Sequence, residues 1–318
     1  MKKHFVRSAA AALLTAAMAS PAAAEYPDRQ MNMVITYGAG GGFDIYARAV
    51  GQMMAKSLPK GVNIVPRNVP GAGGRRGTAV LYRAPADGYT LGILNLPGMV
   101  EPEIVGDKVH FEMDKFIWLG GVNIGTYSIA AGPKSKFTSF DEMKRARSEI
   151  FFATAGGSDY TLARIMTDVL KLNAKFVTGY KGAPAAHLAT VRGEADATMA
   201  ANTTIARKVA AGDLKPVLIF QDNSTKPEFA GVRTVQDIGH PELANLRLYR
   251  LFAAPPGLPR DIREKLTAMV EKAVNDPDLV AWGNKARQPI NPISSADAER
   301  FYGGQKALLS RFKHLLKK

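Results

Sequence analysis

The chain is organised around the segment Thr36-Tyr37-Gly38-Ala39-Gly40-Gly41-Gly42-Phe43-Asp44-Ile45-Tyr46-Ala47-Arg48. An apolar run at 31–35 precedes it and a helical pattern follows, so the segment is predicted to be a strand, a glycine loop and a helix start. Glycine lets the backbone turn tightly, and the first helical N–H groups are unpaired at the positive end of the helix dipole. The loop is either an anion site or a plain strand-to-helix turn. Asp44 is expected to cap the helix or to hydrogen-bond within the loop.

The N-terminus has the features of a secretory leader. Lys2, Lys3 and Arg7 precede an apolar run at 9–19, and small residues follow up to Ala24. This order predicts a signal peptide cleaved after Ala24 and a periplasmic mature protein. Because the chain has no cysteine, disulfides, thiolate metal sites and a cysteine-linked lipid anchor are excluded.

The composition is basic, with 42 Lys and Arg against 28 Asp and Glu. An acidic small ligand, a nucleic acid or anionic membrane, and an ordinary solvated surface are the three interpretations of that excess. No basic cluster is interleaved with aromatic residues, which favours an ordinary surface with weak attraction for anions.

Strand and helix patterns alternate along the chain, which predicts an α/β fold with mainly parallel sheets. The first block runs to about residue 96, and a second block at 150–220 repeats its architecture. Further glycine-rich or small-residue loops lie at 68–77, 154–159 and 179–184. An extended segment at 116–131 is expected to cross between the blocks. In such sheets ligands bind beyond the carboxyl ends of the strands, where these loops gather.

The predicted division, with boundaries uncertain by about ten residues, has two domains. Residues 1–24 are the signal peptide, 25–122 plus 245–318 form the first domain, and 123–244 form the second. A helix predicted at 301–316 is expected to dock on the first domain, and a membrane-surface role is its alternative.

The residues offer little for catalysis. The four histidines of the mature chain are scattered, and His187 is expected to be a surface or packing residue. The sequence after Ser158 lacks the second glycine of a nucleophile elbow. No loop has the dinucleotide or phosphate-loop spacing, so no cofactor, metal or enzyme activity is predicted. A periplasmic hydrolase is the enzyme alternative.

The order and spacing of several short motifs resemble the extracytoplasmic substrate-binding proteins of tripartite tricarboxylate transporters, the Bug or TctC-like family. The resemblance covers nearly the whole mature chain. It rests on Tyr37 to Arg48, Asn68-x-x-Gly71-Ala72-Gly73-Gly74-x-x-Gly77, Pro85-Ala86-Asp87-Gly88-Tyr89-Thr90-Leu91, Tyr180-Lys181-Gly182, Gly193-x-x-Asp196 and Leu251-Phe252-Ala253-Ala254-Pro255-x-Gly257-x-Pro259.

The resemblance implies a Venus-flytrap periplasmic binding protein of type II-like architecture, with one or more crossing strands and a small carboxylate held in the interdomain cleft. It implies recognition by backbone N–H groups, small hydroxyls and water, membrane transporter subunits as partners, and a monomer. A ligand-dependent partner of a membrane sensor is the alternative role. The implied ligand-binding residues are Tyr37, Gly40, Gly41, Gly42, Phe43, Asp44, Gly73 and Arg75 from one domain, and Thr154, Gly156, Ser158, Tyr180, Asn202 and Thr203 from the other.

Two departures from the family pattern bear on the ligand. Phe43 stands where a small or hydroxyl residue is usual, and Arg75 and Arg76 follow the second glycine loop. A phenyl ring and a guanidinium at the mouth would suit a flat or aromatic carboxylate. In the alternative, Phe43 packs behind the loop and Arg75 faces solvent.

Overall fold

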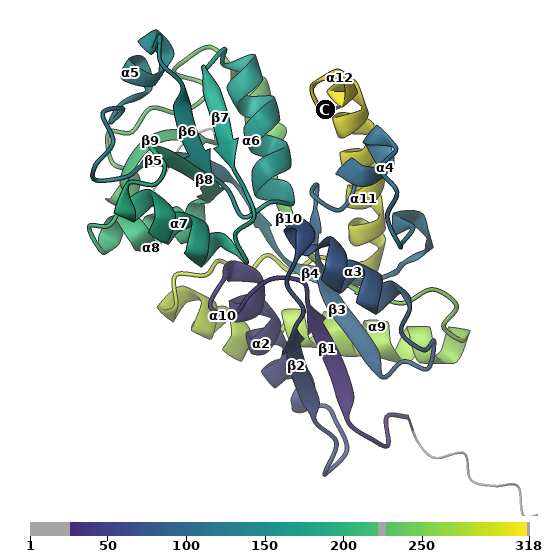
Figure 1. The fold of residues 1–318 in the computed structure, drawn as a ribbon. Helices are drawn as coiled ribbons and strands as arrows, with labels where there is room; N and C mark the ends of the chain where they lie inside the picture. Colours follow the sequence, from purple (N-terminus) through teal and green to yellow (C-terminus); the bar gives the residue numbers. More distant parts are fainter. Residues whose placement is uncertain (1–25, 222–226, 317–318) are drawn as a thin grey trace, which may run out of the picture.

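Two five-stranded β-sheets carry the fold of the computed structural model, one in each of two α/β domains (Figure 1). The structure describes residues 26–221 and 227–316, so the predicted signal peptide lies outside the described residues. The first sheet has the order β2-β1-β3-β10-β4 and the second the order β7-β6-β8-β5-β9. Both sheets are mixed.

The first sheet is built on the apolar run that precedes the glycine segment. Its strands are β1 (Met31–Ile35), β2 (Ile64–Asn68), β3 (Thr90–Leu96), β4 (Ile117–Gly125) and β10 (Leu248–Ala254). β1 pairs in parallel with β2 and β3, with Val34 opposite Gly92. β10 runs antiparallel between β3 and β4. Because β1, β3 and β10 are almost wholly buried, their sequences are nearly continuous apolar runs.

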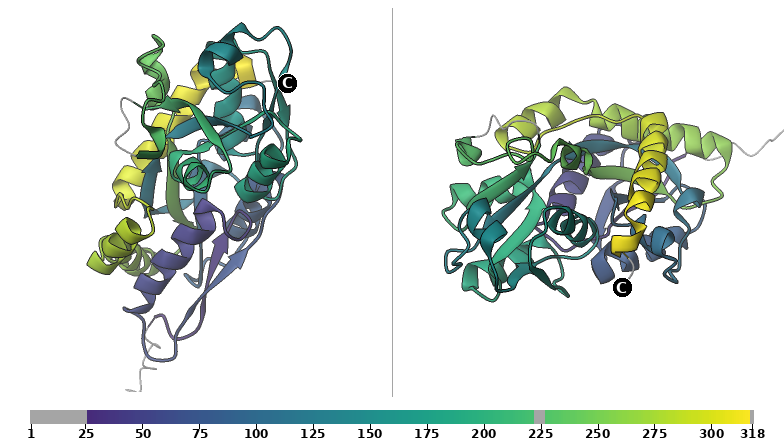
Figure 2. Two further views of the ribbon diagram at one scale, coloured as in Figure 1. Left: turned by 90° about the vertical axis from the view of Figure 1, so that its left-hand side faces the viewer. Right: turned by 90° about the horizontal axis from the view of Figure 1, so that it is seen from above.

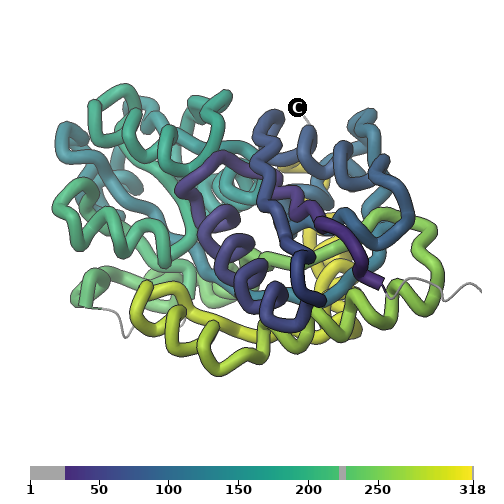
Figure 3. The backbone as a smooth tube through the Cα atoms, turned by 90° about the horizontal axis from the view of Figure 1, so that it is seen from below, coloured from purple at the N-terminus to yellow at the C-terminus, as the bar shows by residue number. Residues whose placement is uncertain are grey.

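Helices surround this sheet, and several of them follow its strands along the chain. They are α2 (Gly42–Ala55), η1 (Ala72–Gly74), α3 (Arg75–Tyr82), α4 (Glu101–Val105), η2 (Met113–Lys115), α9 (Arg260–Val274), α10 (Pro277–Lys285), α11 (Ser295–Arg311) and α12 (Lys313–Leu316). Figure 3 shows α9 and α10 beside α2, against which both pack.

The second domain repeats the arrangement, including the strand directions along the sheet. Its strands are β5 (Tyr127–Ala131), β6 (Ile150–Ala153), β7 (Ala174–Val177), β8 (Ala197–Ala201) and β9 (Lys215–Phe220). β6 is parallel to β7 and β8, whereas β5 is antiparallel to β8 and β9. The helices are α5 (Phe140–Arg145), α6 (Ser158–Val169), α7 (Ala183–Arg192) and α8 (Asn202–Ala210), and the 3-10 turns η3 (Pro227–Phe229) and η4 (Pro241–Asn245) lie between β9 and β10.

The predicted crossing segment is confirmed. Within 116–131, β4 belongs to the first sheet and β5 to the second, with Thr126 alone between them. The chain crosses back between β9 and β10. The short helix α4 and the helix α10 were missed.

The C-terminal helix begins earlier than predicted and is divided. The expected helix at 301–316 is α11 from Ser295, followed by α12. Docking on the first domain is confirmed, because α11 packs on β4. These yellow helices extend along the first domain until α12 reaches α6 of the second (Figures 1 and 2).

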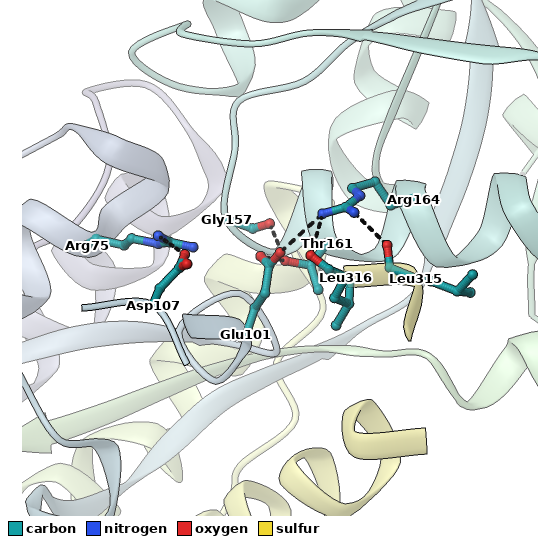
Figure 4. Close-up of polar contacts among 8 residues, drawn as sticks. All are labelled: Arg75, Glu101, Asp107, Gly157, Thr161, Arg164, Leu315 and Leu316. Carbon is teal, nitrogen blue, oxygen red and sulfur yellow. Dashed lines mark hydrogen bonds and ion pairs between the residues drawn. The ribbon is translucent and has the colours of Figure 1, made fainter. Parts of the chain in front are cut away.

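A polar latch, formed by Glu101, Thr161, Arg164 and the carbonyls of Leu315 and Leu316, joins the domains at that point (Figure 4). The Thr161 hydroxyl donates to the buried Glu101 carboxylate at 2.5 Å, and Arg164 lies 3.7 Å from the same carboxylate. Arg164 also donates to the carbonyls of Leu315 at 2.5 Å and Leu316 at 3.0 Å. The helices α4 and α12 of the first domain are therefore both hydrogen-bonded or ion-paired to α6 of the second.

Replacing the latch arginine should loosen α12. Arg164→Met removes charge-assisted hydrogen bonds worth roughly 1.5–3 kcal/mol each in favourable settings. We expect amide hydrogen exchange in α12 to accelerate at least tenfold, with exchange in α9 unchanged. The matched control is Arg300→Met, since the Arg300 side chain is 71% exposed and contacts Asp297 and Phe301 of its own helix, α11. Equal protection of α12 in both variants would show that the latch does not hold this helix.

Candidate functional site

A cavity of about 40 Å³ lies where the glycine loops of the two domains meet. The first domain contributes Gly41, Gly42 and Phe43 at the start of α2, and the second contributes Ala155 and Gly182. Parallel strands direct their carboxyl ends to one edge of a sheet, so loops that follow β1, β6 and β7 are brought to the same side of each domain. The cleft is thus formed by segments that the sequence singled out.

Hydrogen bonds to Asp44 stabilise the first glycine loop. Asp44 accepts hydrogen bonds from the Gly40 N–H at 3.0 Å, from Arg48 at 2.8 Å and from Asn68 at 2.9 Å. Burial opposes ionisation of Asp44, but these donors prevail and lower its pKa. Asp44 therefore holds the loop in shape, as its predicted hydrogen-bonding role within the loop requires.

Aromatic rings form one wall of the cleft. Phe43 is 9% exposed and stacks on Tyr37, with ring centroids 4.8 Å apart. The Tyr37 hydroxyl donates to the Gly73 carbonyl at 2.7 Å and also contacts the Asn95 amide. Tyr37 consequently joins the first glycine loop to the second.

Glycines allow the domains to touch backbone to backbone. A Cβ on Gly73, whose φ is +64°, would lie 2.4 Å from the Gly157 nitrogen. A Cβ on Gly98 would lie 2.1 Å from the Ser158 nitrogen, and the Gly98 N–H donates to the Ser158 hydroxyl at 2.9 Å. Such distances exclude any side chain at these positions while the domains are closed. These glycines therefore serve the approach of the domains, a role that the sequence analysis did not consider.

Arg250 is the principal cleft residue that the sequence analysis missed. It lies on β10 near the crossing, lines the cavity and is only 2% exposed. Its guanidinium donates to the Asn123 side chain and lies over the rings of Phe43 and Tyr46, 5.2 Å and 4.8 Å from their centroids.

No carboxylate of the described chain forms an ion pair with Arg250, and its Nε has no hydrogen-bond partner there. Burial lowers the pKa of Arg250. A buried cation is costly unless an anion or several acceptors compensate it. Gly42 makes room for this group, since a Cβ there would lie 2.9 Å from Arg250 Nη2. A single arginine inside the apolar run at 248–254 was the available sequence clue.

Asp159 faces the same cavity from the second domain. It lies in the first turn of α6. Burial raises its pKa to about 7, and the nearby Arg250 opposes that rise. Because an acidic residue at a helix start is usually a capping or dipole effect, its sequence position gave no reason to single it out.

Several further buried polar atoms have no hydrogen-bond partner in the described chain. They include Asn95 Oδ1, Thr154 Oγ1, Asn202 Oδ1 and Thr203 Oγ1, all in side chains at most 7% exposed. Three of these residues were predicted to bind a ligand. Only Asn95 lines the cavity, where its unpaired Oδ1 can accept a hydrogen bond from a ligand, since buried polar groups normally find a partner. The structure brings Thr154, Asn202 and Thr203 neither to the cavity nor to the neighbouring groove.

The other predicted residues are divided between two spaces. Tyr37, Gly41, Gly42 and Phe43 line the cavity. A larger neighbouring groove of about 930 Å³ is lined by Gly73, Arg75, Gly156 and Tyr180 among others. Arg75 pairs there with Asp107 at 2.9 Å (Figure 4). The structure does not bring Arg75 to the cavity, and Gly40 and Ser158 have their polar groups engaged within the protein.

The remaining chemistry-bearing residues do not form a reactive constellation. His187 is 1% exposed, and burial lowers its pKa to about 4, as fits a packing residue. Within residues 26–221 and 227–316, no group of three or more His, Asp or Glu could hold a metal ion. No helix in that part of the chain has the length and apolarity needed to cross a membrane.

Comparison with known proteins matches most of the chain. The family model described as tripartite tricarboxylate transporter family receptor matches residues 46–317. The protein BugT of Bordetella pertussis is 27% identical over 284 residues, which cover 83% of this chain and 81% of BugT.

Solved structures show the same fold. MatC from Rhodopseudomonas palustris, with bound malate, superposes with a TM-score of 0.79 at 21% identity, covering 92% of this chain and 100% of MatC. A second R. palustris protein, with adipate, gives a TM-score of 0.78 at 18% identity, covering 92% of this chain and 98% of that protein.

Proposed function

Because this chain belongs to the tripartite tricarboxylate transporter receptor family, we propose that it is a periplasmic solute-binding protein that captures a small carboxylate in its interdomain cavity. Its partners would be the membrane subunits of a transporter of that type. The leader at 1–24 supports export. No catalytic arrangement in the described residues favours an enzyme.

One observation carries the carboxylate assignment. The buried guanidinium of Arg250 lines the cavity, and no carboxylate in the described chain forms an ion pair with it. A ligand carboxylate supplies the compensating charge, and an arginine presents a planar edge that a carboxylate matches with two hydrogen bonds. Recognition therefore combines the backbone amides predicted from the glycine loops with a cationic side chain.

The surroundings favour an aliphatic acid over an aromatic one. Tyr37 and the Arg250 guanidinium both lie against the Phe43 ring, so Phe43 is engaged as wall rather than free to stack on a ligand. The cavity is small, at about 40 Å³, which favours a slender chain over a ring. The distant structural relatives with malate and adipate also hold aliphatic acids.

The affinity that such a receptor needs indicates that the two domains close on the ligand. A micromolar ligand needs about 8 kcal/mol net, more than one helix terminus at about 0.3–2 kcal/mol supplies. Loops from both domains must contribute at once, so the ligand binds the closed form selectively and shifts the balance toward it.

A thermal-shift comparison of acids with their primary amides tests the proposal. At pH 7.5 we expect at least one short aliphatic acid at millimolar concentration to raise the melting temperature by 3 °C or more. Its amide, which matches the acid in shape but lacks the charge, should give no shift. Benzoate and nicotinate form the aromatic arm. Equal shifts from acids and amides, or none from any acid, would contradict carboxylate capture.

A further inference from the structure

Arg250 and Asp159 line one cavity from different domains. Arg250 belongs to β10 of the first sheet, and Asp159 belongs to α6 of the second domain. Both residues line the cavity, and the structure contains no ion pair between them. A cation and an anion that share a small space without touching leave room for a group between them.

The arrangement is unfavourable without such a group. Burial lowers the pKa of Arg250 and raises that of Asp159, so the surroundings disfavour the charged form of each residue. Asn123 and the rings of Phe43 and Tyr46 compensate Arg250 in part. Arg250 and Tyr127 oppose the rise in the pKa of Asp159 in part, but no direct ion pair compensates both residues.

A solute that carries only a carboxylate compensates the charge of Arg250 but not that of Asp159. It pairs with Arg250, but it also brings negative charge toward Asp159, which must then take up a proton or repel the ligand. A solute with both a carboxylate and an ammonium group compensates both walls and adds no net charge to a buried space.

We propose that the cavity selects a small zwitterionic solute, an amino acid whose carboxylate binds Arg250 and whose ammonium group binds Asp159. This inference rests on the proposed function and names its solute class. The two ends of the ligand would touch different domains, so binding would draw the domains together. The cavity of about 40 Å³ restricts the solute to a short chain.

Matched pairs of solutes test the inference by calorimetry at pH 8. The probes are glycine, alanine, β-alanine and 4-aminobutyrate, each compared with its counterpart lacking the amino group: acetate, propionate or butyrate. We expect at least one amino acid to bind tenfold or more tightly than its counterpart. Asp159→Asn should abolish that preference. The control is Asp168→Asn on the same helix, where Asp168 is 46% exposed and pairs with Lys171.

The preference should also depend on pH. Asp159 is faced by Arg250 from β10, by Tyr127 from β5 and by Tyr37 from the first loop. Burial raises the pKa of both tyrosines, which stay neutral, and Arg250 stays cationic, so Asp159 is the group that titrates between pH 5.5 and 8. As pH falls below about 7, Asp159 gains a proton and loses its attraction for the ammonium group. The tenfold preference should shrink to threefold or less at pH 5.5.

The outcomes separate the inference from the proposed function. If simple acids bind as tightly as the amino acids at pH 8, with proton uptake, the zwitterion inference is overturned and carboxylate capture remains. If the Asp159→Asn variant still prefers amino acids to their counterparts without the amino group, Asp159 is not the residue that binds the ammonium group. If neither class of solute binds, both the inference and the proposed function fail.

Discussion

Arg250→Gln should lower the affinity for the carboxylate ligand at least 100-fold, which corresponds to about 2.8 kcal/mol. The expected loss is large because truncating one partner of a buried charge pair costs about 2–5 kcal/mol. Glutamine keeps a polar side chain but is two bonds shorter, so the substitution removes the guanidinium together with its hydrogen bond to Asn123. Isothermal titration calorimetry measures the change directly.

The ligand-free fold should survive this substitution. Arg250 forms no ion pair in the described chain, so its removal leaves no carboxylate unpaired. We expect the melting temperature of the ligand-free variant to equal or exceed that of the wild type. Arg250→Lys, which keeps the charge but loses the planar fork, should bind with an intermediate affinity.

Arg29→Gln is the matched control for this series. Arg29 is an exposed residue paired with Asp87 at 2.9 Å, on a part of the first domain that does not line the cavity. The affinity of the Arg29→Gln variant for the carboxylate ligand should stay within twofold of the wild-type value. If the Arg250→Gln protein binds the ligand as tightly as the wild type, the guanidinium takes no part in recognition.

Gly73→Ala should block closure and lower ligand affinity at least 30-fold. The added Cβ would lie 2.4 Å from the Gly157 nitrogen and 3.1 Å from its Cα, both backbone atoms of the opposite domain. Backbone segments packed this closely cannot absorb the overlap, so the domains must stand apart. The apparent affinity then falls with the fraction of molecules able to close.

Backbone strain needs a separate control, because Gly73 has φ +64°. Gly239→Ala matches it: Gly239 has φ +80°, and an added Cβ there would meet no atom within 4 Å. Both variants carry a strain of about 1 kcal/mol or somewhat more, but only Gly73→Ala should lose affinity. Small-angle scattering should show that saturating ligand contracts the Gly239→Ala protein and leaves Gly73→Ala extended. A contraction of both proteins would show that the Gly73 contact does not limit closure.

Local sequence patterns determined most of the architecture. The apolar run at 31–35 with its following glycines predicted β1, the first loop and α2, because a strand, a loop and a helix each have their own residue period. The crossing at 116–131 was likewise predictable, although the helix α10 was missed. The helix expected at 301–316 had the right character, but only the structure showed that it divides and reaches the second domain.

The loops at the cleft could be predicted, but the roles of their residues could not. Asp44 could be assigned to the loop because its partner Gly40 is four residues away. Gly73 meets Gly157, and Gly98 meets Ser158, across the domain boundary. Nothing in the local sequence indicates which backbone will stand opposite a glycine.

By itself, the sequence determined the two-sheet α/β class, the crossing strand and the glycine loops at the cleft, since all of these follow from short-range periodicity and turn chemistry. Only the tertiary structure decided that Arg250 and Asp159, 91 positions apart in the sequence, face one cavity. Electrostatic compensation depends on distance and burial in three dimensions. A lone arginine in an apolar strand and an aspartate at a helix start become parts of one site only when the two domains close.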